Sequence, residues 1–367
     1  MANSVLSTID TELDKGFYES RDGFYRRLFY FMRSLSVRLE GVGVSFEVYR
    51  PSSILERTEK RKLEERIADS DIIFHNKSAM VQVPRQRLWL IDTIDSVITQ
   101  EHRVKSHTFK SRDKYRMSKA MESVGIPIPR TMTVREYLDS ERELPVVLKK
   151  RNGTLGKGVY YIDRPSLVER FFQEERYSKT PGRTPSSRRY LVQQFIRAPG
   201  GFFNHYRVFT VDGEILACTL NFRSTTKESA DAAREAKTLD SIFYDLRSYP
   251  LATNSGREIP VSHQPTYKIS GTKRGILEAH GIDPDNVVIP EPLRQYAQFA
   301  GKELRKHGYV YAGQDWIRDE EGNFYFMEAN PFPDLEIFNT LFLNGKGKRA
   351  DYRSLAASKI AEAIAKI

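Results

Sequence analysis

The chain has 367 residues, of which 40% are hydrophobic and 11% aromatic, a composition typical of a folded globular protein. This length exceeds what one ordinary core holds, so we expect two or three lobes. No apolar run approaches the ~20 residues that span a bilayer, and residues 1–10 lack the basic and apolar parts of a secretion signal. We therefore expect a cytoplasmic protein with no membrane partner.

The net charge of +10 indicates an anionic partner. Many charges alternate in sign, as in residues 55–66, which is typical of a solvated helix face. Basic residues also cluster in 103–119 and 183–189, yet no known nucleic-acid-binding motif accompanies them. Anionic substrates in a cleft are therefore favoured, and nucleic acid stays open only as a secondary partner.

The first part of the chain alternates strand and helix patterns. Short strands are predicted at 5–9, 44–49, 71–74 and 97–99, and helices at 22–33 and 53–68. This alternation predicts an α/β lobe. A further helix, near 118–124, ends at Gly125 because Pro127 and Pro129 cannot continue it, and an extended segment leads into the next lobe.

A glycine-rich turn joins two predicted strands within residues 144–162. The first strand ends in two lysines, and the turn holds three glycines and another lysine: Lys149, Lys150, Gly153, Gly156, Gly158 and Lys157. Glycines let backbone N–H groups approach phosphate oxygens, and the lysines supply positive charge at the same place. The segment therefore predicts a phosphate-binding loop. Its spacing fits neither the Walker pattern nor the dinucleotide fingerprint, since both of those open a helix.

Further strands and helices follow along the chain. A helix is predicted at 164–174, strands at 191–196, 206–211 and 215–222, and helices at 292–307 and 352–366. The only cysteine, Cys218, cannot form an internal disulfide, and we expect a buried strand thiol because no histidine lies beside it in a suggestive motif. The segment 224–290 shows no clear periodicity, and we predict no fold for it.

Two strands near the end of the chain carry acids. Asp315 lies in a strand at 309–317, and a second strand, at 323–327, leads into Glu328 and Asn330. Alternation places Glu328 and Asn330 on the same side of their strand, and residues 319–323 form a turn that would pair the two strands. If the strands pair, three oxygen ligands converge, and such ligands suit a hard cation such as Mg²⁺.

Taken together, these segments resemble the ATP-grasp superfamily in order and spacing, most closely ribosomal-protein glutamate ligases, D-alanine–D-alanine ligases and glutathione synthetases. The likeness rests on Lys149, the loop 152–158, the strand 191–196, the segment 205–211, and Asp315 with Glu328 and Asn330. Residues 112–131 are also similar to that family's Asp-Lys helix and its Gly-Ile-Pro-x-Pro turn. The resemblance covers residues from about 108 to 345.

The resemblance implies a fold of the α/β (α+β) class, with an N-terminal α/β lobe followed by two α+β lobes that clamp ATP. The implied boundaries are 1–107, 108–196 with the linker helix, and 197–367 with an insertion at about 224–290. It also implies an ATP-dependent carboxylate–amine ligase. In that reaction a small-molecule or peptide carboxylate attacks the γ-phosphate of ATP, which gives an acyl phosphate and ADP, and an amine acceptor then displaces phosphate to form an amide or peptide bond.

The resemblance also assigns cofactors and site residues. One or two Mg²⁺ ions, or Mn²⁺ in their place, would be held by Asp315, Glu328 and Asn330. The α- and β-phosphates of ATP would contact Lys114 and Lys149, and the β- and γ-phosphates would lie under Gly153, Thr154, Gly156, Lys157 and Gly158. The adenine would be flanked by Gln193 and Gln194 and read by the backbone at Phe195 and Ile196. Near the transferring phosphoryl group would lie the catalytic Arg207 and Arg223.

Several alternatives stay open at this stage. The superfamily includes phosphotransferases that stop at phosphoryl transfer, and a nucleotide-binding protein without ligase activity could keep the same fold. The polar, turn-rich segment 177–189 is either a surface loop or a lid over bound ATP. Relatives commonly dimerise, so a homodimer also stays open.

Overall fold

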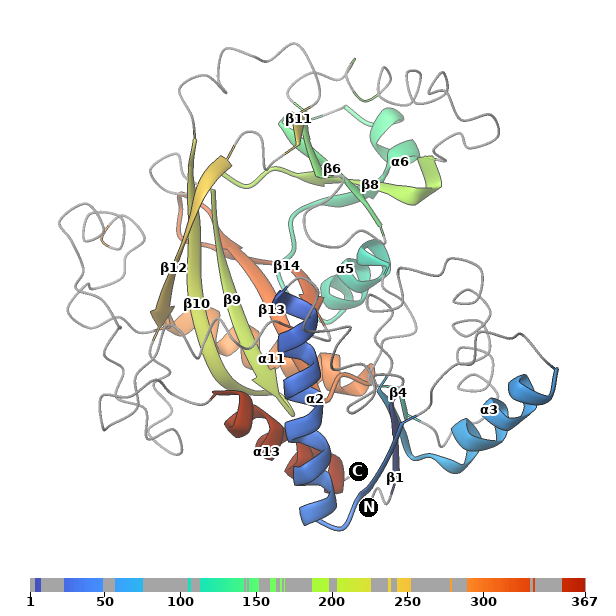
Figure 1. Ribbon diagram of the computed structural model, residues 1–367. Coiled ribbons are helices and arrows are strands. Elements are labelled where there is room, and N and C mark those ends of the chain that lie inside the picture. The colour runs from blue at the N-terminus through green and yellow to red at the C-terminus, as the bar shows by residue number, and fades with distance from the viewer. Residues whose placement is uncertain are drawn as a thin grey trace.

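The computed structural model describes residues 4–7, 23–48, 57–74, 105–106, 113–141, 143, 145–151, 159–162, 166, 168, 187–197, 203–225, 237–238, 243–251, 278, 289–330, 333 and 352–366. Within these residues the strands form three sheets, with helices packed between and around them (Figure 1). We call them the N-terminal, central and C-terminal sheets. The predicted mixture of helices and strands is confirmed. No helix in the part of the chain that the structure describes is long and apolar enough to cross a membrane.

The N-terminal sheet has the parallel pairing expected of an α/β lobe. Its strand order is β2-β1-β3-β4, with bounds Ser45–Val48, Ser4–Ser7, Ile72–Phe74 and Lys105–Ser106. Parallel strands require crossover connections, and two are supplied by the helices α2 (Gly23–Gly41) and α3 (Arg57–Asp69). Helix α2 extends eight residues beyond its predicted end. The predicted strand at 97–99 lies outside the described residues.

The central sheet is antiparallel and divides its side chains between two faces. The order is β11-β7-β6-β8-β5, with bounds Lys237–Thr238, Val159–Ile162, Val146–Lys150, Tyr190–Gln194 and Thr131–Thr133. One face packs on the short helix α6 (Val134–Leu138), with Val146, Leu148 and Val192 in a common core. A single 3₁₀ turn, η1 (Ser187–Arg189), precedes β8. Because side chains alternate along a strand, Lys149 and Gln193 lie on the opposite face.

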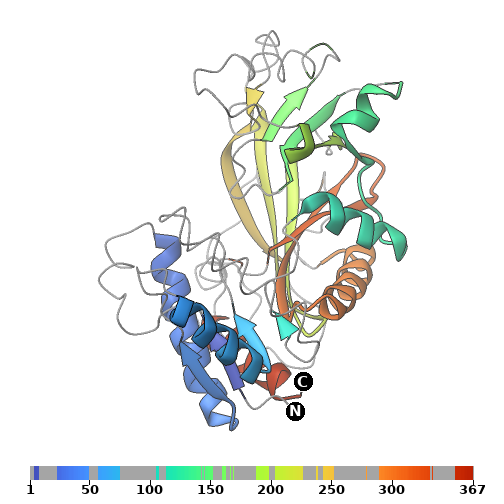
Figure 2. The same cartoon turned by 90° about the vertical axis from the view of Figure 1, so that its right-hand side faces the viewer.

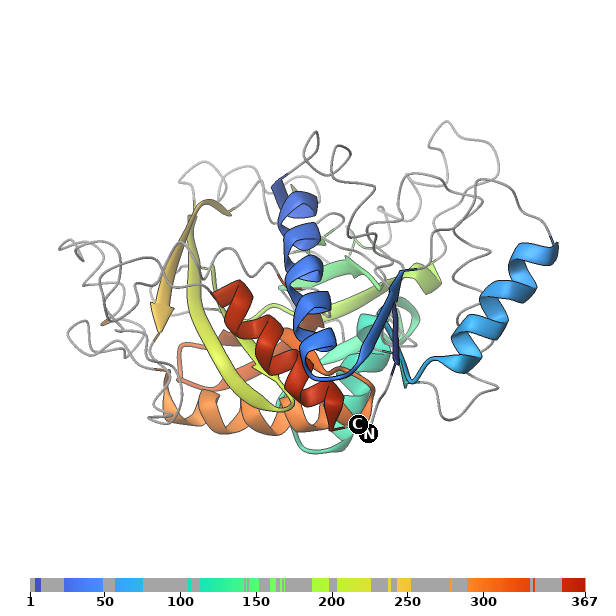
Figure 3. The same ribbon diagram turned by 60° about the horizontal axis from the view of Figure 1, so that its bottom comes forward.

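The C-terminal sheet is the largest part of the fold. Its order is β12-β10-β9-β13-β14, with bounds Phe243–Leu251, Glu214–Thr225, Phe203–Val211, Tyr311–Arg318 and Phe324–Asn330, and all its pairs are antiparallel. Helix α11 (Glu291–Lys306) packs on one face through Leu293, Ala297 and Leu304 (Figure 2). On the other face, one end of the sheet shares a core with α2 and with α13 (Tyr352–Ala365), which crosses α2 (Figure 3).

Helix α5 (Lys114–Ser123) lies between the central and C-terminal sheets (Figure 1). Its first residue is bonded to the end of β6, since the Lys114 backbone N–H donates to the Arg151 carbonyl at 3.0 Å. Beyond its C-terminal end, the Phe326 N–H of β14 donates to the Pro127 carbonyl at 2.8 Å. The helix and the extended segment after it therefore contact both sheets, as the proline pattern at 125–130 predicts for a linker.

The segment 224–290, for which no fold is predicted, contributes two strands that the sequence analysis missed. β12 pairs with β10 at the edge of the C-terminal sheet, and β11 pairs with β7 of the central sheet. β11 lies within residues 197–367 but belongs to the central sheet, so the chain passes between sheets there. The lobe boundaries themselves remain predictions. Cys218 is fully buried in β10 as predicted, and burial raises the pKa of its thiol.

Candidate active site

A row of charged residues crosses three neighbouring strands of the C-terminal sheet. Asp315 on β13 is the register partner of Arg207 on β9 and of Glu328 on β14, so the predicted pairing of the two acid-bearing strands is confirmed. The Arg207 guanidinium binds both carboxylate oxygens of Asp315, with Nε donating to Oδ1 at 2.8 Å and Nη2 to Oδ2 at 2.9 Å. Bidentate pairing of this kind fixes the plane of the guanidinium.

The strand geometry brings Asn330 to the same carboxylate. Its side-chain amide lies 3.4 Å from Asp315 Oδ2. Between Asp315 and Trp316 the pairing of β13 with β14 shifts by one residue. A β-bulge re-aims the side chains beside it. The predicted turn at 319–323 is also present, with the Asn323 N–H donating to Asp319 Oδ1 at 2.7 Å.

Lys114 reaches this row from the first turn of α5 and forms an ion pair with Glu328. Asp113 caps the helix by accepting from the Tyr115 N–H at 3.0 Å, and it also accepts from Arg151 Nε at 2.9 Å. The start of α5 is thus fastened to the end of β6. The sequence analysis includes Asp113 only as part of the Asp-Lys helix and does not single out Arg151, although the two residues together fix the start of α5.

Lys149 approaches the row from the central sheet. Its side chain is only 5% exposed, and Nζ donates to Gln193 Oε1 at 2.8 Å. Burial and, to a smaller extent, the charge of Lys114 lower the pKa of Lys149 to about 8, although the charges of Glu328 and Asp315 oppose that shift. These electrostatic effects indicate that Lys149 faces the acid-bearing hairpin of the other sheet.

The carboxylate of Glu328 is held in its ionised form. Burial by itself would raise the pKa of Glu328, but the charges of Lys114, Lys149 and Arg207 outweigh that effect and lower it. Three cations therefore surround two carboxylates, which leaves an excess positive charge for an anionic ligand.

The donor set fits Mg²⁺ only if a ligand supplies further oxygens. Asp315, Glu328 and Asn330 provide two carboxylates and an amide, which are hard donors of the kind that Mg²⁺ takes from proteins. In the described ranges no cluster of three or more histidine, cysteine, aspartate and glutamate side chains could hold a metal by itself. A site of this type needs phosphate oxygens, and the nearby cations suit them.

Comparison with known proteins addresses the fold. No protein-family model and no curated protein sequence matches the chain. Among solved structures, D-cycloserine synthetase DcsG is similar at 16% identity with a TM-score of 0.50, covering 99% of this chain and 98% of that one. The ATP-grasp ligase PsnB in complex with a minimal precursor gives 13% identity, a TM-score of 0.48 and coverage of 99% and 100%. D-alanine–D-alanine ligase from Bacillus anthracis in complex with ATP gives 15% identity and a TM-score of 0.49. The match covers 100% of this chain and 96% of that one.

The chain has the ATP-grasp fold. The resemblance seen in the sequence is confirmed at this level. At such low identities a structural likeness shows the fold alone, and the site residues carry the information on activity.

The glycine-rich turn of the ATP-grasp fold lies outside the described residues. This holds for Gly153, Thr154, Gly156, Lys157 and Gly158. The strands on either side are described, and Lys149 of β6 is the register partner of Val159 of β7. The two strands that flank the turn are therefore paired as predicted, and β6 ends at Lys150, one residue beyond Lys149.

Arg223 is described only in its backbone. Arg207 pairs with Thr219 of β10, so Arg223 lies four residues further along that strand, opposite Phe203. At about 3.3 Å per residue this is roughly 13 Å along the sheet from the charged row. The structure thus brings Arg207 into the row, and the role of Arg223 remains a prediction.

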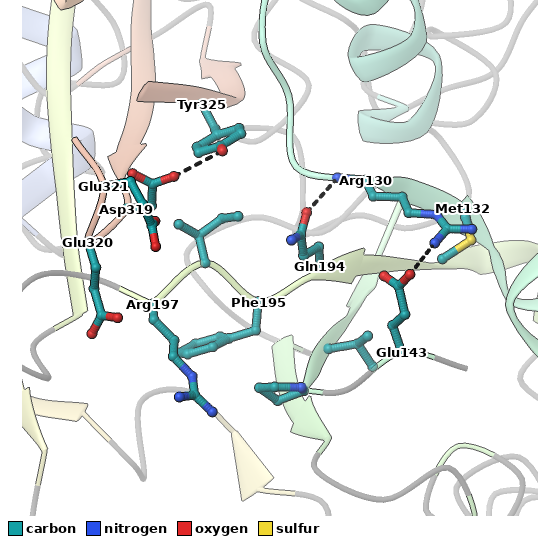
Figure 4. Close-up of a pocket in the computed structure, with 13 residues that line it drawn as sticks. Arg130, Met132, Glu143, Gln194, Phe195, Arg197, Asp319, Glu320, Glu321 and Tyr325 are labelled. Atoms are coloured by element: carbon teal, nitrogen blue, oxygen red, sulfur yellow. Dashed lines mark hydrogen bonds and ion pairs between the residues drawn. The ribbon is translucent and has the colours of Figure 1, made fainter. Parts of the chain in front are cut away.

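The predicted adenine-binding residues lie on two sides of β8. Gln193 points to Lys149, whereas Gln194 points away and accepts from the Arg130 N–H at 3.3 Å. Gln194, Phe195 and Ile196 line a cavity of about 400 Å³ (Figure 4). The other walls of this cavity include the 319–321 turn and Tyr325 of the acid-bearing hairpin.

Proposed function

We propose that the protein is an ATP-dependent ligase that joins a carboxylate to an amine through an acyl phosphate and releases ADP and phosphate. The observation that carries this proposal is the charged row Arg207–Asp315–Glu328 together with Lys114 and Lys149, placed where the two sheets of an ATP-grasp fold meet. Such an arrangement suits a triphosphate and Mg²⁺ better than either ligand alone.

The chain's residues divide the binding of MgATP among them. Lys114 and Lys149 bind phosphate oxygens, and the glycine-rich turn after Lys149 covers the β- and γ-phosphates. Asp315, Glu328 and Asn330 hold Mg²⁺, which neutralises phosphate charge when bound.

The chemical step gathers negative charge in a small volume. As the substrate carboxylate attacks the γ-phosphorus, the bond to ADP breaks and charge spreads over the phosphoryl oxygens. Arg207 stabilises that charge, because its guanidinium is already oriented by Asp315 before the reaction begins. The amine then attacks the acyl carbon, and phosphate leaves with the electrons of the acyl–oxygen bond.

The proposal is tested by a pairwise screen of small-molecule and peptide carboxylates with amines for ADP release, followed by mass measurement of the product. ADP should appear only when both substrates are present, and hydroxylamine in place of the amine should trap an acyl hydroxamate. A stable phosphorylated product without an amide would instead identify a phosphotransferase. Binding of ATP with no turnover for any pair would identify a nucleotide-binding protein without ligase activity.

A variant pair separates the metal site from the rest of the C-terminal sheet. Asp315→Asn should lower turnover at least about a hundredfold, the size expected when a group that stabilises transition-state charge is lost. Glu214→Gln makes the same change of charge at an exposed position of β10 in the same sheet, outside the cavity, and should leave turnover intact. Full turnover in Asp315→Asn would contradict the assignment of Asp315 to the metal.

A further inference from the structure

We propose that Thr131 is a positioning residue that acts through Gln193 to aim the Lys149 ammonium group at the phosphates of the nucleotide. The proposal rests on the proposed function, because it concerns the same triphosphate site. Thr131 lies on β5, two strands away from Lys149 on β6, and β8 with Gln193 lies between them.

The direction of three hydrogen bonds fixes the orientation of the Gln193 amide. The Thr131 hydroxyl donates to the Pro129 carbonyl at 2.7 Å, so its single proton is in use and its oxygen acts as an acceptor. Gln193 Nε2 donates to that oxygen at 2.8 Å. Its Oε1 atom is therefore turned to the other side, where it accepts from Lys149 Nζ at 2.8 Å.

Burial makes this orientation costly to lose. Thr131 is 1% exposed and Gln193 is 0% exposed, so water does not replace a missing partner for either side chain. Without the Thr131 hydroxyl, the amide could rotate and present its N–H groups to an ammonium group that has no acceptor to offer. Buried polar networks depend in this way on every member being satisfied.

The acceptor on Gln193 opposes the attraction of Lys149 to the acidic residues of the C-terminal sheet. Lysine carries a compact charge on a flexible four-carbon stem, and the charged groups that act on Lys149 are Lys114 of α5, Asp315 of β13 and Glu328 of β14. The two carboxylates attract the ammonium group toward the proposed metal ligands. The bond to Gln193 holds it back, so that its other N–H groups can meet phosphate oxygens.

The test is a double-mutant cycle on ligand binding, which needs no turnover. We measure the Kd of MgATP and of magnesium tripolyphosphate by calorimetry for the wild type, Thr131→Val, Lys149→Met and the double variant. Thr131→Val should weaken both ligands about tenfold, the loss expected for a hydrogen bond to a charged group. In the Lys149→Met background it should change Kd less than about twofold, since the group that it positions is absent.

Controls separate positioning from stability. Thr131→Ser keeps the hydroxyl and should restore binding to within about twofold of the wild type. Thr210→Val removes a buried hydroxyl that accepts from the Gln314 amide at 3.1 Å in the C-terminal sheet, and it should leave both Kd values unchanged. Thr131→Ala serves as the second variant if Thr131→Val does not fold.

Two results would overturn the proposal. An equal loss of affinity with and without Lys149 would show that Thr131 acts on the lobe as a whole. A loss for MgATP but not for tripolyphosphate would show that Gln193 serves the base instead. Both leave the proposed function standing, whereas a wild-type protein that binds neither ligand contradicts the proposed function and this role of Thr131 with it.

Discussion

Lys149 combines burial with a pKa of about 8, and this predicts how nucleotide binding depends on pH. A phosphate ligand favours the charged form of Lys149. Below pH 8 Lys149 already carries its proton, whereas above pH 8 binding must be accompanied by proton uptake. The affinity for MgATP should therefore fall as pH rises through about 8, by up to about tenfold per unit. Calorimetry in two buffers of different ionisation enthalpy measures the uptake directly.

Lys149→Met is the control for that pH dependence, because it removes the titrating group while keeping most of the side-chain volume. The affinity of this variant for MgATP should be lower than that of the wild type and should not change between pH 7 and pH 9. A wild-type affinity that stays constant through pH 9 would contradict the assignment.

The bond between Arg207 and Asp315 also stabilises the fold. Arg207→Ala leaves a carboxylate that is about one-tenth exposed without its bidentate partner, so we expect the free energy of unfolding to fall by about 1 to 3 kcal/mol. The matched control is Arg61→Ala, since Arg61 is 82% exposed in its pair with Glu65 and should contribute less than about 0.5 kcal/mol. Urea unfolding measures both, and equal losses would refute this prediction.

At the scale of elements, the hairpin between β9 and β10 depends on Gly213. Asp212 and Gly213 have positive φ angles of 52° and 85°, as a two-residue turn of the primed type requires. A Cβ at Gly213 would also lie 2.7 Å from Lys302 Cγ and 3.3 Å from the Lys302 backbone nitrogen of α11. The turn and the helix therefore pack closely.

Gly213→Ala should lower the free energy of unfolding by about 2 kcal/mol or more, through strain at positive φ and through contact with α11. Gly43→Ala is the control, because Gly43 has a similar φ of 78° but open space around it, and only the strain of about 1 kcal/mol applies. Chemical denaturation of the two variants separates the cost of strain at positive φ from the cost of the contact with α11. If the free energy of unfolding fell no further in Gly213→Ala than in Gly43→Ala, Lys302 would have moved aside without cost, which would contradict this prediction.

The acid-bearing hairpin could be predicted from sequence because its signals are local. Asp315, Glu328 and the turn between them lie within fourteen positions, so alternation and turn chemistry determine their relation. The same holds for the pairing of β6 with β7, because residues 151–158 alone separate these two strands.

Contacts between distant strands could not be predicted in this way. Thr131 meets Gln193 only because β5 pairs with β8, and a shift of β5 by one residue would turn the Thr131 side chain to the other face. β12 escaped prediction because its sequence does not alternate cleanly and contains Pro250, which an edge strand tolerates. Lys114 was assigned by resemblance alone, since nothing in its spacing indicates that it reaches Glu328.

At the scale of the whole molecule, one hydrophobic core joins the N-terminal sheet to the C-terminal sheet. It contains Met32 and Leu35 of α2, Phe209 of β9, and Ile360 and Ile364 of α13. The last helix of the chain thus packs against one of the first, which holds the N-terminal part in place beside the sheet that carries the charged row (Figure 3).

Ile360→Ala should lower the free energy of unfolding by about 2 to 5 kcal/mol, because the side chain is fully buried at this junction. Glu362→Ala, an exposed position on the same helix, should change it by less than about 0.5 kcal/mol. Thermal and urea unfolding provide the comparison. A similar stability of the two variants would mean that α13 contributes little to the core.

The attachment of α5 to both neighbouring sheets has a mechanical consequence. If the central sheet swings away to admit a nucleotide, the bond between Lys114 and Arg151 pulls the start of the helix along, while the bond between Pro127 and Phe326 anchors its far end. Helix α5 would then couple the movement of the central sheet to the C-terminal sheet. The distance between the Lys114 and Glu328 side chains would report how far the two sheets are separated.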